Sequence, residues 1–221
     1  MKLLLKAASV LVIGVIAVGL LLFISAGTMV YPGGWLFMAV LFVPMMLCGV
    51  ILYCKAPKLL EKRLNAREKQ KTQQGVIALS GLMFPCAFVL SALDFRFGWS
   101  QVPLWVMLAA SAVFLIGYAL YGEVMRENVW LSRTVEVQEN QTVVDTGLYG
   151  IVRHPMYMAT MFMFLPMPLI LGSYIGLIPM VLYPVVTVIR IRNEEAVLTE
   201  GLPGYAAYRE KVKYRLIPFV W

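Results

Sequence analysis

The sequence predicts an all-α integral membrane protein of about six helical segments, four of them membrane spans and the last two a short C-terminal hairpin. Of its 221 residues, 61% are hydrophobic and only 14% are charged, whereas about 25% of a typical soluble domain is charged. Long stretches contain no Asp, Glu, Lys or Arg, and 18 of the 19 Lys and Arg fall on one side of the predicted membrane. This composition excludes an ordinary soluble domain, a disordered chain and a disulfide-rich secreted module.

The first charge-free stretch, residues 7–54, is 48 residues long. That length suffices for two crossings of about 20 residues each. The sequence Tyr-Pro-Gly-Gly at 31–34 marks a turn between them, so we expect helices over 7–27 and 34–54. The first apolar run exceeds the 7–15 residues of a signal peptide core, which favours an uncleaved helix.

Three further helical regions follow. Residues 72–93 predict a third span with a kink at Pro85, and residues 103–125 predict a fourth. The last charge-free stretch, 155–189, is divided by Gly172 and Ser173 into halves of roughly 16 residues. Such halves rise only about 24 Å, short of a hydrocarbon core of about 30 Å. We therefore expect a tight, incomplete hairpin.

The basic residues predict the orientation of the chain. With the N-terminus inside, the inner segments are 1–6, 55–71, 126–154 and 190–221, and only Arg96 lies outside. This asymmetry follows the positive-inside rule and predicts cytosolic N- and C-termini. The net charge of +7 is then an orientation signal, and we expect no nucleic-acid partner. The charged segment after the second helix either lies on the inner membrane surface or forms a solvated loop.

Two regions are predicted along the chain: N-terminal transmembrane helices over 1–125 and a functional core over 126–221. Polar residues concentrate in 138–157 and from 190 onward, on either side of the hairpin. Hairpin geometry brings both stretches to one membrane face. We expect a cytosolic pocket there, with access for lipids from the side. The aromatic and basic tail predicts an interfacial helix.

A few residues in these stretches are candidates for chemistry. His154 is the only histidine and directly precedes Pro155, which suits the first position of a helix and an anion-friendly helix end. Glu194 and Glu195 are adjacent carboxylates, and Arg190 lies one turn before Glu194 on the same helix face. Purely structural roles, a satisfied histidine and a helix-end salt bridge, are the alternatives. The sequence has no CxxC pair, GxGxxG or P-loop, so we expect no metal and a non-Rossmann site.

Two ordered motifs around the hairpin resemble a known signature. They are Gly147-x-Tyr149-x-x-x-Arg153-His154-Pro155-x-Tyr157 and Arg190-x-x-x-Glu194-Glu195-x-x-Leu198, followed by Gly204-Tyr205-x-x-Tyr208 and Ile217-Pro218. Over about 125–221 the chain resembles the isoprenylcysteine carboxyl methyltransferase family and its wider relatives, which include phospholipid N-methyltransferases.

The resemblance implies a membrane methyltransferase that uses S-adenosyl-L-methionine at its cytosolic face. The cofactor contacts that it implies are Gln138, Gln141, Thr142, Val143, Val144, Tyr149, His154, Pro155, Met156, Tyr157 and Glu194. Relatives often have His where this chain has Gln141. Arg190 matches the arginine assigned to the acceptor substrate, and we predict Arg190 and Glu195 as catalytic residues.

The acceptor is expected to be a lipid or lipidated molecule. A carboxylate is already a nucleophile at neutral pH, so O-methylation of an isoprenylcysteine-like carboxyl group needs only alignment, which Arg190 would provide. N-methylation of an amine headgroup lipid would also need a base, such as Glu123 or Glu195. A membrane NADPH-dependent reductase and a non-catalytic scaffold or small transporter are the remaining alternatives.

Overall fold

The structure is a computed structural model that describes residues 2–65, 71–131 and 137–221, and these residues form helices, turns and loops without strands. The helices are α1 (Lys2–Ala26), α2 (Pro32–Lys55), α3 (Pro57–Asn65), α4 (Lys71–Phe97), α5 (Leu104–Glu127), the 3₁₀ helix η1 (Gly147–Gly150), α6 (Pro155–Phe164), α7 (Met167–Ile170), α8 (Leu177–Met180), α9 (Leu182–Gly201) and α10 (Tyr205–Lys211). By length and composition, α1, α2, α4 and α5 can each cross a membrane. The predicted all-α membrane fold is confirmed.

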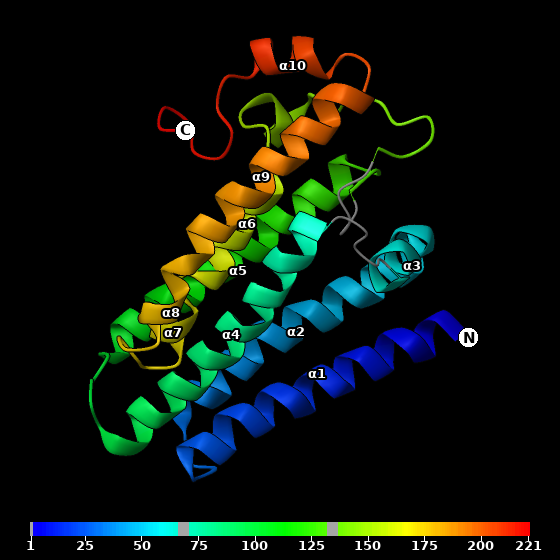
Figure 1. The fold of residues 1–221 in the computed structure, drawn as a ribbon. Helices are drawn as coiled ribbons and strands as arrows, with labels where there is room; N and C mark the ends of the chain where they lie inside the picture. Colours follow the sequence, from blue (N-terminus) through cyan, green and yellow to red (C-terminus); the bar gives the residue numbers. More distant parts are fainter. Residues whose placement is uncertain (1, 66–70, 132–136) are drawn as a thin grey trace.

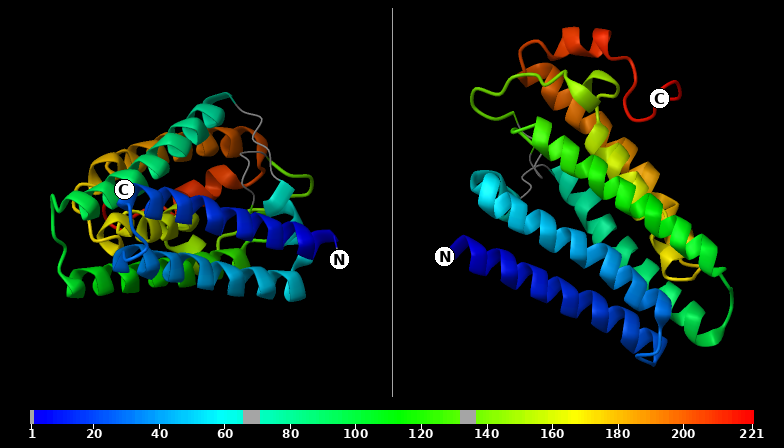
Figure 2. Two further views of the ribbon diagram at one scale, coloured as in Figure 1. Left: turned by 90° about the horizontal axis from the view of Figure 1, so that it is seen from below. Right: turned by 180° about the vertical axis from the view of Figure 1, so that it is seen from behind.

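The long helices form a bundle, and the hairpin packs along one side of it against α4 and α5 (Figures 1 and 2). Helix α5 contacts α2, α6 and α7, while α4 contacts α1, α8 and α9. Figure 1 shows the α1–α2 turn, the α4–α5 loop and the hairpin turn at one end of the bundle. The N-terminus, α3 and α10 lie toward the opposite end, which we call the basic end because 15 of the 16 Lys and Arg among the described residues belong to its segments.

The first two helices agree with the sequence prediction apart from their ends. Helix α1 begins at Lys2 rather than at residue 7, because lysine side chains can extend their charged ends toward water from the end of an apolar helix. Helix α2 begins with Pro32 at its first position. The next residue, Gly33, packs so closely on the hairpin that a Cβ there would lie 2.6 Å from the Leu171 carbonyl oxygen. Only glycine allows this approach.

Residues 155–201 form a broken hairpin of four helices, α6 to α9, rather than the two short helices expected. Its turn nevertheless reaches the end of the bundle opposite the basic end, where buried Asp94 accepts a hydrogen bond from the Ser173 hydroxyl. Asp94 also accepts bonds from the Ser100 amide (2.6 Å) and hydroxyl (2.5 Å). One carboxylate thus joins the end of α4, the α4–α5 loop and the hairpin turn.

The close contact between α5 and α6 sets the depth at which α6 begins. A Cβ at Gly117 of α5 would lie 2.9 Å from the Ala159 carbonyl oxygen of α6. From this contact α5 continues ten residues to Glu127, whereas α6 extends back only four residues to Pro155. At 1.5 Å per residue, α6 begins about one or two helical turns below the end of α5. This recess is the floor of the candidate site.

Candidate active site

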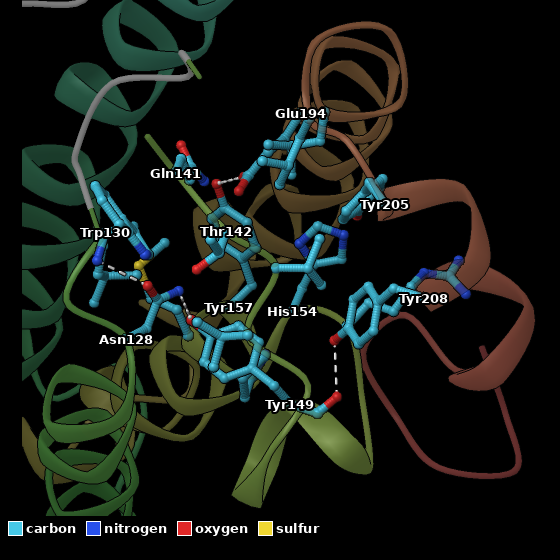
Figure 3. Close-up of a pocket in the computed structure, with 18 of the residues that line it drawn as sticks. Asn128, Trp130, Gln141, Thr142, Tyr149, His154, Tyr157, Glu194, Tyr205 and Tyr208 are labelled. Carbon is cyan, nitrogen blue, oxygen red and sulfur yellow. Dashed lines mark hydrogen bonds between the residues drawn. The ribbon is translucent and has the colours of Figure 1, made fainter. Parts of the chain in front are cut away.

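A pocket at the basic end is enclosed by the end of α5, the loop before the hairpin, the start of α6, one face of α9 and helix α10 (Figure 3). Trp130 and Asn128 lie on one side of it, and Tyr205 and Tyr208 on the other. Its lining consists of Asn128, Trp130, Leu131, Gln141, Thr142, Val143, Val144, Tyr149, Arg153, His154, Pro155, Met156, Tyr157, Arg190, Glu194, Leu198, Leu202, Tyr205 and Tyr208.

The end of α5 holds the wall formed by the loop. The Asn128 side-chain amide donates to the Tyr149 hydroxyl (2.8 Å), and the Asn128 side-chain oxygen accepts the Trp130 amide (2.9 Å). The Glu127 carboxylate accepts the Leu148 amide (3.2 Å). Gly147, the residue before Leu148, has a φ of +50°, and a Cβ at position 147 would collide with the Glu127 carboxylate. Glycine therefore permits the turn that places Tyr149 in the pocket.

Three side chains joined by hydrogen bonds lie on the floor of the pocket. The Tyr157 hydroxyl accepts a hydrogen bond from Arg190 Nε (2.8 Å) and donates one to Glu194 Oε2 (2.6 Å). Arg190 and Glu194 do lie on the same face of α9, as their spacing predicts. The phenol between them joins α6 to α9 and orients both charged groups.

Glu195 points away from this pocket, although it adjoins Glu194. Its carboxylate is 4% exposed and accepts hydrogen bonds from Arg153 Nε (2.7 Å) and Arg215 Nε (2.8 Å). His154 Nε2 lies 3.3 Å from the same carboxylate. Burial alone would raise the pKa of Glu195, but the hydrogen bonds from His154, Arg215 and Arg153 outweigh it and hold the pKa well below its usual range. Neighbouring residues on a helix point about 100° apart, which explains why only one of the two glutamates lines the pocket.

The Arg153 guanidinium also fixes the C-terminal tail. It donates to the carbonyl oxygens of Val212 (2.7 Å) and Lys213 (3.0 Å), while the Arg153 and His154 amides donate to the carbonyls of Tyr214 and Arg215. The tail is thereby attached to the start of α6. Arg153 and His154, both buried, connect the tail, α9 and the pocket wall.

Gln138 is the one implied cofactor contact that does not line the pocket. Its side-chain amide donates to the Trp130 carbonyl (2.6 Å), and its side-chain oxygen accepts from Lys62 Nζ (2.8 Å). Its backbone amide donates to the Gln141 side-chain oxygen (2.8 Å). Because both ends of the amide group are engaged outside the pocket, Gln138 holds Trp130 in place and does not face the cavity.

Several residues that line the cavity had no predicted role in it: Asn128, Trp130, Leu131, Leu198, Leu202, Tyr205 and Tyr208. Tyr205 and Tyr208 belong to the tail motif, so their spacing was an available signal. Burial raises the pKa of both phenols. The Tyr208 hydroxyl donates to the Tyr149 carbonyl (2.8 Å), whereas the Tyr205 hydroxyl is buried without a hydrogen-bond partner among the described residues.

Comparison with known proteins gives one finding about this region. Residues 105–203, from the start of α5 to just past the end of α9, match the family described as phospholipid methyltransferase. No curated protein matches the chain. The matched segment supplies most of the pocket lining and the hydrogen-bonded side chains of Arg190, Tyr157 and Glu194. Over residues 105–203 the chain is therefore similar to the phospholipid methyltransferase family, which belongs to the isoprenylcysteine carboxyl methyltransferase-like group.

Proposed function

We propose that the protein transfers a methyl group from S-adenosylmethionine to a lipid acceptor at the basic end of the bundle. The observation that carries this proposal is the convergence of residues on one pocket. Ten of the eleven cofactor contacts implied by the resemblance line the same cavity, with Gln138 as the exception. They come from three separate chain segments, so their meeting is a property of the fold rather than of sequence proximity.

The chemistry of the lining suits this cofactor, which when bound supplies a methyl group on a positively charged sulfur. Glu194 can accept from its ammonium or ribose groups, and the rings of Tyr149 and Tyr205 can face a cation through their π-systems. The unpartnered Tyr205 hydroxyl is a buried polar group that a polar ligand would satisfy. The cavity encloses only about 100 Å³, so a ligand containing a nucleoside would extend beyond this volume or displace part of the pocket wall.

Arg190 is proposed to orient the acceptor. Its guanidinium lines the pocket and is steadied by the Tyr157 hydroxyl, an arrangement suited to holding a carboxylate. O-methylation of an isoprenylcysteine-like carboxyl group follows from this. The family match favours a second candidate, N-methylation of an amine headgroup. That reaction needs a base, and Glu194 is now the better proposal because Glu195 is held by its ion cluster and Glu123 is paired with Arg126.

Three further sequence predictions remain proposals: the division of the chain at 125 and 126, the cytosolic position of both termini, and the catalytic role of Arg190. We replace the catalytic role of Glu195 with a positioning role, because its carboxylate is taken up by Arg153, Arg215 and His154. In that role it holds His154 and the tail against the pocket.

Titration calorimetry on the purified full chain in detergent tests the proposed function. S-adenosylmethionine and its demethylated product should bind, and NADPH should not. Glu194→Ala should weaken cofactor binding at least tenfold, since a hydrogen bond to a charged group contributes about 1.5–3 kcal/mol. Arg190→Ala should lower turnover more than cofactor affinity. Glu200→Ala, an exposed residue of the same helix, is the control.

Failure of folded wild-type protein to bind either methyl-donor ligand would refute the proposal. Supplying the active protein with a carboxyl-bearing isoprenylated thioether and, separately, an amine headgroup lipid decides between the two acceptors by which product gains the labelled methyl group.

A further inference from the structure

A second cavity lies beside the candidate active site, between the ends of α2 and α5 and the start of α3. It has a volume of about 870 Å³, and we call it the α2–α5 groove. Its interior is apolar, with side chains such as Leu52 and Met125. It opens outward beside Ile51 and Val129, which are 54% and 63% exposed. The groove therefore has the size and lining of a site for hydrocarbon chains.

The rim of the groove is positively charged. Lys55, Lys58, Lys62 and Arg126 belong to its lining, which contains no acidic residue. Arg126 is paired with Glu123 and Lys62 donates to the Gln138 side chain, whereas neither Lys55 nor Lys58 has an ion pair among the described residues. Two exposed ammonium groups beside an apolar cavity complement a ligand with apolar chains and an anionic head.

The groove and the active-site pocket share Trp130 as a lining residue. The Trp130 amide donates to Asn128 and its carbonyl accepts from Gln138, while Lys62 Nζ lies 5.9 Å from the centre of its ring. These contacts hold the indole between the two cavities. A molecule in the groove is thus one side chain away from the pocket that contains Arg190.

We propose that the α2–α5 groove binds the acceptor lipid through its apolar chains, with a phosphate of its headgroup at Lys55 and Lys58 and its reacting end directed past Trp130. This inference rests on the proposed function, and within it on the amine headgroup lipid, because an isoprenylcysteine-like acceptor carries no phosphate. The binding of a phosphate lipid can be tested independently of methyl transfer. Lys55 and Lys58 would select phosphate lipids over neutral ones, and Trp130 would lie between the apolar chains in the groove and the cofactor pocket.

Saturation binding to the purified full chain in a neutral detergent tests the groove. The probes are radiolabelled diacyl phosphatidic acid, a diacylglycerol with the same chains, and inorganic phosphate. Lys55→Gln with Lys58→Gln should weaken the phosphatidic acid about 25-fold, about fivefold for each lysine, and leave diacylglycerol within twofold. Lys2→Gln with Lys213→Gln removes the same charge from the basic end outside the groove and should have little effect.

A second pair of variants tests the apolar cavity. Gly122 lines the groove, and a Cβ there would meet nothing within 4 Å, so we choose Gly122→Leu to occupy part of the groove. It should weaken both lipids at least tenfold and change S-adenosylmethionine affinity less than twofold. Gly49→Leu, at an equally open position of α2 that does not line the groove, is the matched control.

Equal losses in the control variants, or displacement of phosphatidic acid by millimolar inorganic phosphate, would overturn the groove as a lipid site. Equal affinity for the two lipids would overturn the role of the lysines. Calorimetry on the same samples separates the two proposals. Cofactor binding without saturable lipid binding contradicts the groove alone, and lipid binding without cofactor binding contradicts the proposed function alone.

Discussion

At the scale of single residues, the neighbours Glu194 and Glu195 show how one residue step changes a role. Glu194 faces the pocket and accepts from Tyr157, whereas Glu195 lies in a buried cluster with Arg153 and Arg215. Two guanidinium groups and one carboxylate together carry a net positive charge, and they lie behind the pocket wall. Such a cluster is costly to break, because removing one partner leaves uncompensated buried charge.

We expect Glu195→Gln to lower the free energy of unfolding by about 3 kcal/mol, since it removes the charge that compensates two arginines but keeps the shape of the side chain. Thermal denaturation in detergent measures this. Glu200→Gln, on the exposed face of α9, should change the melting temperature little. A melting temperature equal to that of the wild type would show that the cluster contributes no stability.

The contribution of Glu195 to stability should depend on pH. Because the pKa of Glu195 is lower in the folded protein than its ordinary value of 4.5, its carboxylate adds stability above about pH 4.5 and loses it as the pH falls below that value. The stability difference between wild type and Glu195→Gln should therefore shrink as the pH falls below about 4.5. A difference that grows below pH 4.5 would contradict this assignment.

At the scale of elements, the loop before the hairpin depends on one backbone conformation. Gly147 has φ of +50° and lies against the Glu127 carboxylate at the end of α5. An L-residue in the left-handed region costs about 1–2 kcal/mol before any clash. The conformation of this part of the pocket wall, and with it the position of Tyr149, therefore depends on a glycine at position 147.

Gly147→Ala should lower the free energy of unfolding by at least about 1–2 kcal/mol and weaken S-adenosylmethionine binding. Gly81→Ala provides a control of opposite sign. Gly81 lies within α4, where a Cβ meets nothing within 4 Å, so alanine should stabilise the helix by about 0.5–1 kcal/mol. Thermal denaturation of both variants tests the pair, and equal shifts would refute the conformational argument.

At the scale of the whole molecule, the hairpin that carries part of the site is also anchored at the opposite end of the bundle. Asp94 is fully buried and binds Ser100 and the hairpin turn at Ser173. This anchorage holds the hairpin against α4 and α5. The start of α6, which carries His154 and Tyr157, is the other end of the same packed unit.

Asp94→Ala should destabilise the protein by about 2–4 kcal/mol, because it leaves buried hydroxyl and amide donors without their acceptor. It should also weaken cofactor binding, since the hairpin is no longer anchored. Ser100→Ala removes one of the donors and should cost about 1 kcal/mol. Thermal denaturation and calorimetry measure both effects. Unchanged stability in Asp94→Ala would show that the hairpin is positioned by apolar packing alone.

The distribution of charge predicts the orientation of the whole chain. The inner segments predicted from the sequence contain 18 of the 19 Lys and Arg, so both termini should face the cytosol. A reporter that fluoresces only in the cytosol should be active when fused to either end, and a reporter active only outside should be silent. The opposite pattern would reverse the orientation and place the pocket outside the cell.

The positions of the spans follow from the amino-acid sequence, because in lipid the backbone N–H and C=O groups of each apolar stretch must form their hydrogen bonds within a helix. The charge-free gaps therefore predict α1, α2, α4 and α5 to within a few residues, and the motifs locate most of the pocket. The directions in which individual side chains point are visible only in the tertiary structure. Glu195 and Gln138 face away from the pocket and Trp130 and Tyr205 face into it, because those directions depend on packing between segments distant in the sequence. The anchorage of the hairpin by Asp94 depends on the same packing, which no local pattern records.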